Sequence, residues 1–300
     1  MEMFEGRNIQ IGIAPIGWTN DDMPQLGEEI TFEQCISETA LAGYTGVEVG
    51  GKFPTDPTVL KQALDIRGLR VASQWFSSRL CETPYEENEY AFRMQLAFLE
   101  AVGANRVNVC ELTRNLFASE LSMFGDNKPV ASDGEWLKLC AGLDKLGKIA
   151  MARGFKLCFH HHMATVVQTL SETKRLMNYT NPEYVHLCYD TGHFTFSDED
   201  AVEAVKLFAK RIAHVHLKDI RLDKMKQAKD EGFKFRKAVL EGCFTVPGDG
   251  CVDFPGVFAA LSENEYEGWL LVEAEQDPAL ANPFAYAKSA RKYISETAGV

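Results

Sequence analysis

Three features of this 300-residue chain predict an α/β fold, namely a (β/α)8 TIM barrel that forms a single domain over residues 1–300. Short apolar runs alternate with longer amphipathic stretches from one end to the other, and eight such units are present. The length is typical of one barrel. An open doubly wound sheet usually carries a glycine-rich phosphate loop after its first strand, whereas this chain reads APIGWTNDD there.

The eight apolar runs predict strands at 9–14, 46–50, 70–75, 106–111, 155–160, 185–190, 212–217 and 269–275. The amphipathic stretches predict helices at 32–43, 57–67, 87–103, 134–153, 168–178, 199–210, 254–264 and 283–297. Strands that alternate with helices pair in parallel through right-handed crossovers, which is the arrangement of a closed barrel.

Polar residues and glycines mark several helix boundaries. Thr31 with Gln34 predicts a capping box, and Ser197 precedes the acidic first turn of the helix expected at 199–210. Glycines that follow a helical stretch and precede a strand predict C-terminal caps, and these are Gly43, Gly68, Gly103 and Gly154.

One connection, at about 218–250, is unusually long and rich in Lys and Arg. Long barrel loops are commonly lids or binding loops, and positive charge in an acidic protein favours a lid over an oxygen-rich substrate. The alternative is a solvated excursion with one charged helix. The adjoining tract at 246–254, VPGDGCVDF, predicts a turn rather than catalysis by Asp249.

Composition narrows the classes of partner. The formal net charge of −12 argues against nucleic acid and against anionic membranes. Eight scattered cysteines lack Cys-x-x-Cys spacing, which favours buried free thiols in a reducing cytosol. The sequence shows no signal-peptide pattern and no apolar run near the roughly 20 residues of a membrane span. We therefore expect a cytoplasmic protein with no nucleic-acid or membrane partner. A homo-oligomer stays open, because such barrels commonly associate.

Alternation along the strands places ionisable side chains inside the barrel, near the carboxyl ends where barrel sites are built. All seven histidines lie between His160 and His216. Together with an aspartate and two glutamates they supply imidazole nitrogen and carboxylate oxygen from four consecutive strands, a set suited to a divalent transition metal. The candidate metal ligands are His160, Asp190, His216, Glu273 and Glu275.

Alternation leaves some assignments open. Residues 160–162 are all histidine, so we expect His160 as ligand, His162 toward the substrate and His161 outward. Glu273 and Glu275 both face inward, and alternation does not choose between them. In the first half of the chain the inward polar residues are Glu48, Gln74 and Asn108. Trp18 and Trp75 follow strands and predict either an apolar wall of a sugar site or packing under a loop.

Taken in order, these motifs resemble the xylose-isomerase-like TIM-barrel superfamily of sugar isomerases, epimerases and dehydratases, and within it the inosose dehydratase family. The matching stretches are IGIAPIGWTNDD, GVEVGGKFP, QWFSS, FHHHMAT, YDTGH, HVHLKDIR, FTVPGDG and VEAEQDP. They run from residue 11 to residue 278. Much of the superfamily carries glutamate where this chain has His160, so the ligand set at that strand departs from the common pattern.

The resemblance implies a hydro-lyase that needs Mn2+ or Co2+ and dehydrates 2-keto-myo-inositol (scyllo-inosose), a small polyol ketone of myo-inositol catabolism. The implied product is 3D-trihydroxycyclohexane-1,2-dione. The implied route is α-proton abstraction, a metal-stabilised enediolate and β-elimination of water. It also implies that the metal is bound by His160, Asp190, His216 and one of the two glutamates Glu273 and Glu275.

Within that route the candidate bases are His162, His193 and whichever of Glu273 and Glu275 does not bind metal. Lys218 would steady the enolate or protonate the leaving hydroxyl. The candidate substrate contacts are Trp18, Glu48, Gln74, Trp75, Asn108 and Glu111.

Three alternatives stay open at this point. An epimerase or ketose isomerase on the same barrel shares the enediolate and lacks the elimination. A phosphodiesterase acting on damaged DNA needs several metals and a basic surface, which the acidic charge disfavours. A catalytically silent sugar-binding barrel predicts no tightly bound metal.

Overall fold

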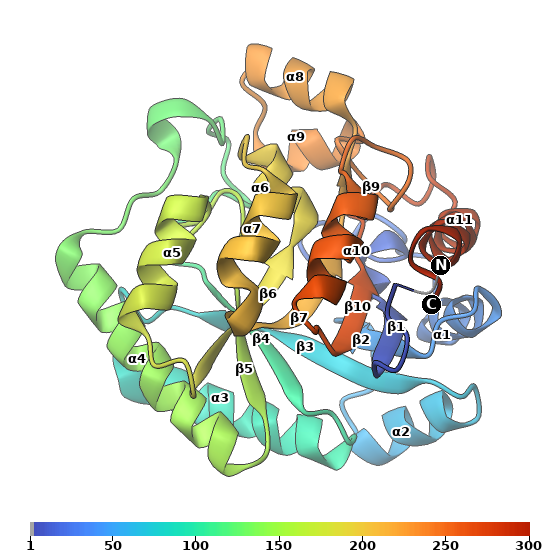
Figure 1. Cartoon of the computed structure of the whole chain (residues 1–300), viewed down its shortest axis with the longest axis horizontal. Helices are drawn as coiled ribbons and strands as arrows, with labels where there is room; N and C mark the ends of the chain where they lie inside the picture. The colour runs from blue at the N-terminus through green and yellow to red at the C-terminus, as the bar shows by residue number, and fades with distance from the viewer. Residues whose placement is uncertain (1–2) are drawn as a thin grey trace.

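The computed structural model, which describes residues 3–300, is a closed barrel of eight parallel strands surrounded by helices (Figure 1). The predicted fold is therefore confirmed. Around the barrel the strands follow one another as β1 (Ile9–Ile13), β2 (Gly46–Val49), β3 (Arg70–Ser78), β4 (Arg106–Glu111), β5 (Lys156–His160), β6 (Val185–Asp190), β7 (Ile212–Leu217) and β10 (Gly268–Val272).

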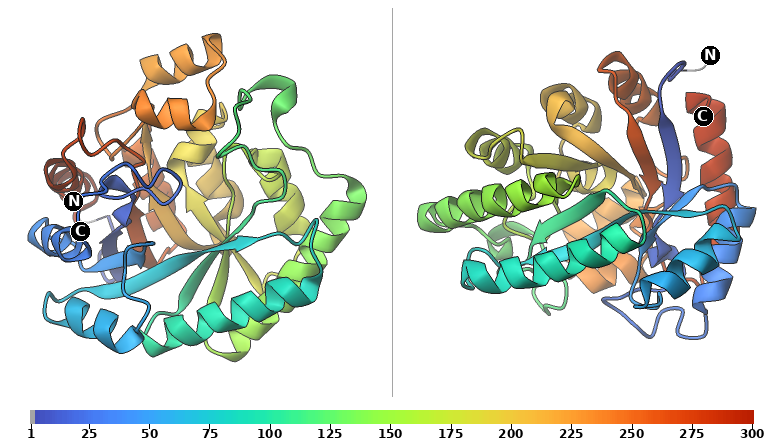
Figure 2. Two further views of the ribbon diagram at one scale, coloured as in Figure 1. Left: turned by 180° about the vertical axis from the view of Figure 1, so that it is seen from behind. Right: turned by 90° about the horizontal axis from the view of Figure 1, so that it is seen from below.

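Eight helices cover the outside of the strands, as the two views of Figure 2 show. They are α1 (Phe32–Leu41), α2 (Pro57–Asp65), α3 (Tyr85–Ala101), α4 (Asp133–Ala152), α5 (Leu170–Tyr179), α7 (Ala201–Phe208), α10 (Phe254–Glu263) and α11 (Pro283–Ala298). Outward strand residues such as Leu157, Phe159 and Val215 pack under them in the main apolar core. None of the helices in residues 3–300 is both long and apolar enough to cross a membrane.

All sixteen predicted strands and helices agree with the structure within three residues at each end, whereas two of the predicted helix caps differ. The Thr31 hydroxyl caps α1 by accepting a hydrogen bond from the Gln34 amide at 3.2 Å, but the Gln34 side chain turns to Glu38, so the capping box is incomplete. Ser197 does not start a helix. It ends the short helix α6 (Thr191–Phe196), and Asp200 caps α7. The four predicted glycine caps all adopt positive φ, between 68° and 90°.

The long connection after β7 is an ordered substructure, which we call the cap (residues 219–245). Strand β8 (Asp219–Ile220) pairs antiparallel with β9 (Phe244–Thr245), and helices α8 (Leu222–Asp230) and α9 (Phe235–Leu240) lie between them. Figure 1 shows both helices outside the ring that surrounds the barrel. The alternative of a solvated excursion with one charged helix is wrong, because the connection has two helices and buried side chains give both an apolar face: Met225, Ala228, Phe235, Ala238 and Val239.

Candidate metal centre and cavity

The side chain of Asp190 lies at the centre of the polar cluster. Asp190 ends β6 and begins α6, where its Oδ1 accepts a hydrogen bond from the His193 amide at 2.8 Å. This contact turns Oδ2 toward the barrel axis, where it is buried and makes no hydrogen bond. Three imidazole nitrogens approach it: His160 Nε2 at 3.5 Å, His193 Nε2 at 3.7 Å and His216 Nδ1 at 3.7 Å.

The ring of His216 lies between two carboxylates. Its Nδ1 is 2.9 Å from Glu273 Oε2, on the Asp190 side, and its Nε2 is 2.9 Å from Glu48 Oε1. Burial lowers the pKa of His216, but Cys188 and the two glutamates outweigh burial and hold that pKa well above its ordinary value. The Glu48 contact fixes the ring orientation and leaves Nδ1 directed at the centre of the cluster.

Lys218 supplies the second buried cation. Its Nζ lies 2.5 Å from Glu273 Oε1, 2.9 Å from Glu275 Oε1 and 3.1 Å from His193 Nε2. Burial raises the pKa of Glu275 to about 7, despite the opposing effect of Lys218. For Glu273 burial acts in the same direction, but Lys218 and His216 prevail and lower its pKa to about 2. The two glutamates that follow β10 therefore differ in environment, although alternation treats them alike.

His162 forms the edge of the cluster that faces the cavity. Its Nδ1 lies 2.7 Å from the Met163 carbonyl, which requires the proton on Nδ1 and leaves a lone pair on Nε2. That Nε2 is 3.9 Å from Glu275 Oε1. Burial and the nearby Lys218 charge hold the pKa of His162 well below its ordinary value. His161 faces outward as expected, where it stacks on Phe194 at 3.7 Å.

A cavity of about 340 Å³ opens above this cluster. Of the sequence-predicted site residues, its walls contain Glu48, Gln74, Trp75, His162, Glu273 and Glu275. The buried Gln74 Oε1 has no hydrogen-bond partner, so an acceptor stands free at the wall. The Trp75 ring lies edge-on to His160 and His162, with centroid separations of 5.4 and 5.8 Å.

Three predicted substrate contacts lie elsewhere. Trp18 is buried, and its Nε1 donates to Glu38 Oε2 of α1 at 2.6 Å, so the indole is held by this helix and does not form a wall of the cavity. Asn108 lies below the cavity and donates to Glu48 Oε1 at 2.6 Å. Glu111 accepts hydrogen bonds from Ser78 and the Leu80 amide, at 2.8 and 2.9 Å, and so anchors the connection after β3. None of the three lines the cavity.

The cap and the loop after β4 roof the cluster with aromatic rings. Phe117 lies 4.6 Å from the His162 ring and 5.1 Å from Phe235 of α9, centroid to centroid. Both phenylalanines belong to a second apolar cluster that joins the cap to the barrel loops. Because that cluster is apolar, it limits the access of water to the imidazoles beneath it.

Several residues of the site were not identified from the sequence. Ser73 and His214 join Glu48 in a buried hydrogen-bonded layer below His216. Asp21 and Asp22 line the cavity from the loop after β1. Their only sequence signal was the acidic end of APIGWTNDD, which carries no spacing that marks a site.

The cluster fits a divalent metal. Asp190 Oδ2 and both ring nitrogens of His160 are buried without a hydrogen-bond partner, and unsatisfied buried polar atoms require compensation. Ligand atoms of Asp190, His216 and Glu273 lie within 4.8 Å of one another, as do those of His160, Asp190 and His193. A third group within the same limit combines His162 and His193 with Glu275.

Comparison with known proteins agrees with this architecture. A family model described as "Xylose isomerase-like TIM barrel" matches residues 36–297. An inosose dehydratase of Geobacillus thermodenitrificans is 51% identical over 298 residues, covering 99% of this chain and all of that protein. An inosose dehydratase of Clostridium perfringens is 52% identical, covering 96% of this chain and 97% of its own. A solved structure of the "IOLI protein with a binding zinc atom" superposes with a TM-score of 0.72 at 15% identity, covering 97% of this chain and 98% of its own.

Proposed function

This chain belongs to the inosose dehydratase family of xylose isomerase-like TIM barrels, and from this membership we propose that it dehydrates 2-keto-myo-inositol to 3D-trihydroxycyclohexane-1,2-dione. The observation that carries the proposal is the identity of about half of all residues to inosose dehydratases over essentially the full length. The buried cluster of imidazoles and carboxylates under a cavity supports it, because the reaction needs proton transfer beside a carbonyl.

We assign the metal site to His160, Asp190, His216 and Glu273. Glu273 is preferred over Glu275 because it shares the space between Asp190 and His216, whereas Glu275 lies beside His162. A mixed nitrogen and oxygen set without thiolate favours Mn2+ or Co2+. When bound, such an ion supplies Lewis-acid polarisation of the substrate carbonyl and stabilises the negative charge that develops on its oxygen.

Glu275 and His162 then move the proton. Both line the cavity, and His162 presents an unprotonated Nε2. We assign to this pair the removal of the proton from the carbon next to the carbonyl, whose electron pair becomes the carbon–carbon double bond of the enolate. Collapse of the enolate expels hydroxide from the next carbon, and a proton delivered by the pair converts it to water. The resulting enol tautomerises to the dione.

Lys218 and His193 position this machinery. Neither lines the cavity, and the Lys218 ammonium donates to Glu275 Oε1 and to His193 Nε2. The ammonium therefore holds the Glu275 carboxylate in place and balances its charge. Gln74 and Trp75 are assigned to the substrate: the free Gln74 Oε1 accepts from a hydroxyl, and the Trp75 ring forms an apolar wall.

The test uses protein stripped with chelator and given scyllo-inosose with and without Mn2+ or Co2+. We expect a metal-dependent rise in ultraviolet absorbance from the enolised dione. His216→Ala abolishes it, whereas His186→Gln, a half-buried histidine at the opposite end of the barrel, retains it. Exchange of the substrate proton with solvent without the absorbance rise would replace the dehydratase by an epimerase or isomerase. Absence of both signals would overturn the proposal.

A further inference from the structure

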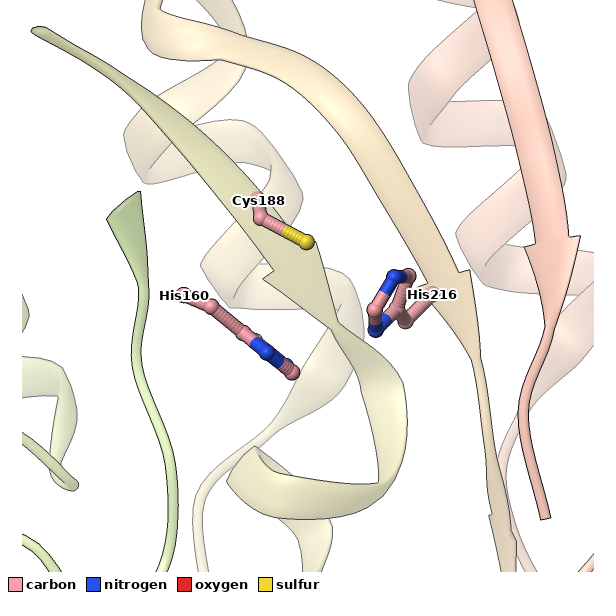
Figure 3. Close-up of side chains that lie close together, drawn as sticks. All are labelled: His160, Cys188 and His216. Atoms are coloured by element: carbon pink, nitrogen blue, oxygen red, sulfur yellow. The ribbon is translucent and has the colours of Figure 1, made fainter. Parts of the chain in front are cut away.

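A cysteine lies directly beneath the proposed metal site. His160 on β5, Cys188 on β6 and His216 on β7 direct their side chains into one space (Figure 3). One ligand atom from each lies within 4.8 Å of the other two. Cys188 pairs with His160 in the register of β5 and β6, and it precedes Asp190 by two residues, so its sulfur lies one layer below that carboxylate.

The three side chains are buried, and both nitrogens of the His160 ring remain available to bind a metal. The three side chains are at most 1% exposed, and neither ring nitrogen of His160 has a hydrogen-bond partner. A neighbouring thiol, Cys158, differs in this respect. It belongs to the same small apolar cluster, but its sulfur contacts the Lys156 carbonyl at 3.8 Å and takes part in no ligand group among residues 3–300.

Two imidazoles and one thiol form a softer ligand set than the oxygen-rich one above it. Thiolate sulfur favours Zn2+, Cd2+ and Cu+, whereas carboxylate oxygen favours Mn2+. Coordination breaks the S–H bond of the cysteine. The proton passes to the buffer and the sulfur lone pair forms the bond to the ion, with no change of oxidation state.

We propose that His160, Cys188 and His216 form a second, thiophilic metal-binding set that shares its two imidazoles with the set containing Asp190 and Glu273. Because the imidazoles are shared, the two sets are mutually exclusive. A thiophilic ion held by Cys188 withdraws both histidines from the upper set and stops turnover. The inference rests on the proposed function only in taking the upper set as the working one.

The test is a titration of the chelator-stripped full chain with Cd2+, because a cadmium–thiolate bond has an ultraviolet charge-transfer band that other ligands do not produce. We expect the wild type to develop this band with one equivalent of Cd2+. Cys188→Ser loses the band and lowers Cd2+ affinity at least about tenfold, as expected when a direct ligand is removed. Cys158→Ser, the matched buried control, keeps both.

Each other outcome overturns the inference. A wild type that binds Cd2+ in calorimetry without the band has no cysteine ligand, and a band that survives in Cys188→Ser comes from another thiol. Cys188→Ala serves in the same comparison if the serine variant does not fold. Failure of the proposed function appears separately, as absence of turnover with Mn2+ in a wild type that still develops the cadmium band.

Discussion

Replacing Lys218 with methionine tests whether its ammonium compensates the buried carboxylates. The substitution keeps an unbranched side chain, one heavy atom shorter than that of lysine, and removes its charge. In the native protein Nζ lies 2.5 Å from Glu273, 2.9 Å from Glu275 and 3.9 Å from Asp190. All three carboxylates are at least nine-tenths buried, so water replaces little of the lost interaction.

The expected loss is large because the pairs are buried. Removal of one partner of a buried ion pair costs about 3–5 kcal/mol, since the remaining charge stays unsolvated. Three carboxylates share this cation, whereas His216 still faces Glu273 and Asp190, so we expect a value inside that range. The control is Lys128→Met, which breaks an ion pair with Glu172 of the same 2.5 Å length but with both side chains about one-fifth exposed. Water reaches this control pair, and a solvent-accessible pair contributes about 1 kcal/mol or less.

Urea unfolding of both chelator-stripped variants at pH 7.5 measures the difference. We then repeat the experiment at one fixed Mn2+ concentration, a hundredfold above the wild-type Kd, which stabilises the wild-type protein by about 2.7 kcal/mol. Because the ion brings positive charge to the same carboxylates, the deficit of Lys218→Met must shrink with metal while that of Lys128→Met does not change. Equal losses in the two variants, or a deficit that is insensitive to metal, would refute the reasoning.

Three further predictions follow from single contacts. Glu48→Gln removes the carboxylate that orients the metal-facing β7 histidine, so chelator competition must show a loss of metal affinity of about 10–100-fold with an unchanged circular dichroism spectrum. Burial lowers the pKa of His161 from 6.5 to about 3, so the unfolded chain binds a proton that the native state does not, and stability falls as the pH drops from 6.5 toward 3. In metal-free protein, His161→Gln must reduce that slope, measured by urea unfolding at pH 7 and 5, by up to about 1.4 kcal/mol per pH unit. Gly147→Ala places Cβ 2.3 Å from the backbone carbonyl that precedes β6 and must lower the unfolding free energy in a urea titration by about 1–3 kcal/mol, whereas Gly134→Ala on the same helix has no atom within 4 Å and must not.

The strands were predictable because each is a short apolar run that can be recognised from its own residues. Buried runs with apolar outward residues identified β4, β6 and β7 at both ends. Strand β10 ends at Val272 rather than residue 275, because its pairing with β7 stops where that strand stops, at Leu217. The end of β10 thus depends on a partner residue 55 positions earlier in the chain. The alternation of apolar residues within β10 itself carries no information about that partner.

The sequence was sufficient to predict which side chains point into the barrel. It was not sufficient to predict which of these side chains contact one another. A period of two places Glu273 and Glu275 on the same face, and only the closed barrel shows that one faces His216 and the other His162. The same limit applies to Glu48. It was expected to bind substrate, and although it lines the cavity, its Oε1 is occupied by side chains from β3, β4 and β7 that closure brings beneath it.

The charges of the cluster explain why a divalent ion suits it. Four buried carboxylates surround two groups whose pKa values lie above their ordinary range, which leaves two negative charges uncompensated when all are ionised: Glu48, Asp190, Glu273 and Glu275 against His216 and Lys218. Uncompensated charge in so buried a cluster is costly, and the apolar roof of Phe117 and Phe235 limits the access of water from its own side. Because His216 must lose its proton to bind the metal, a bound dication lowers this deficit from two negative charges to one. The same burial that makes the metal-free cluster unfavourable therefore increases its affinity for the ion. Phe235→Ala, which opens the roof, should weaken metal binding although Phe235 is not one of the assigned ligands.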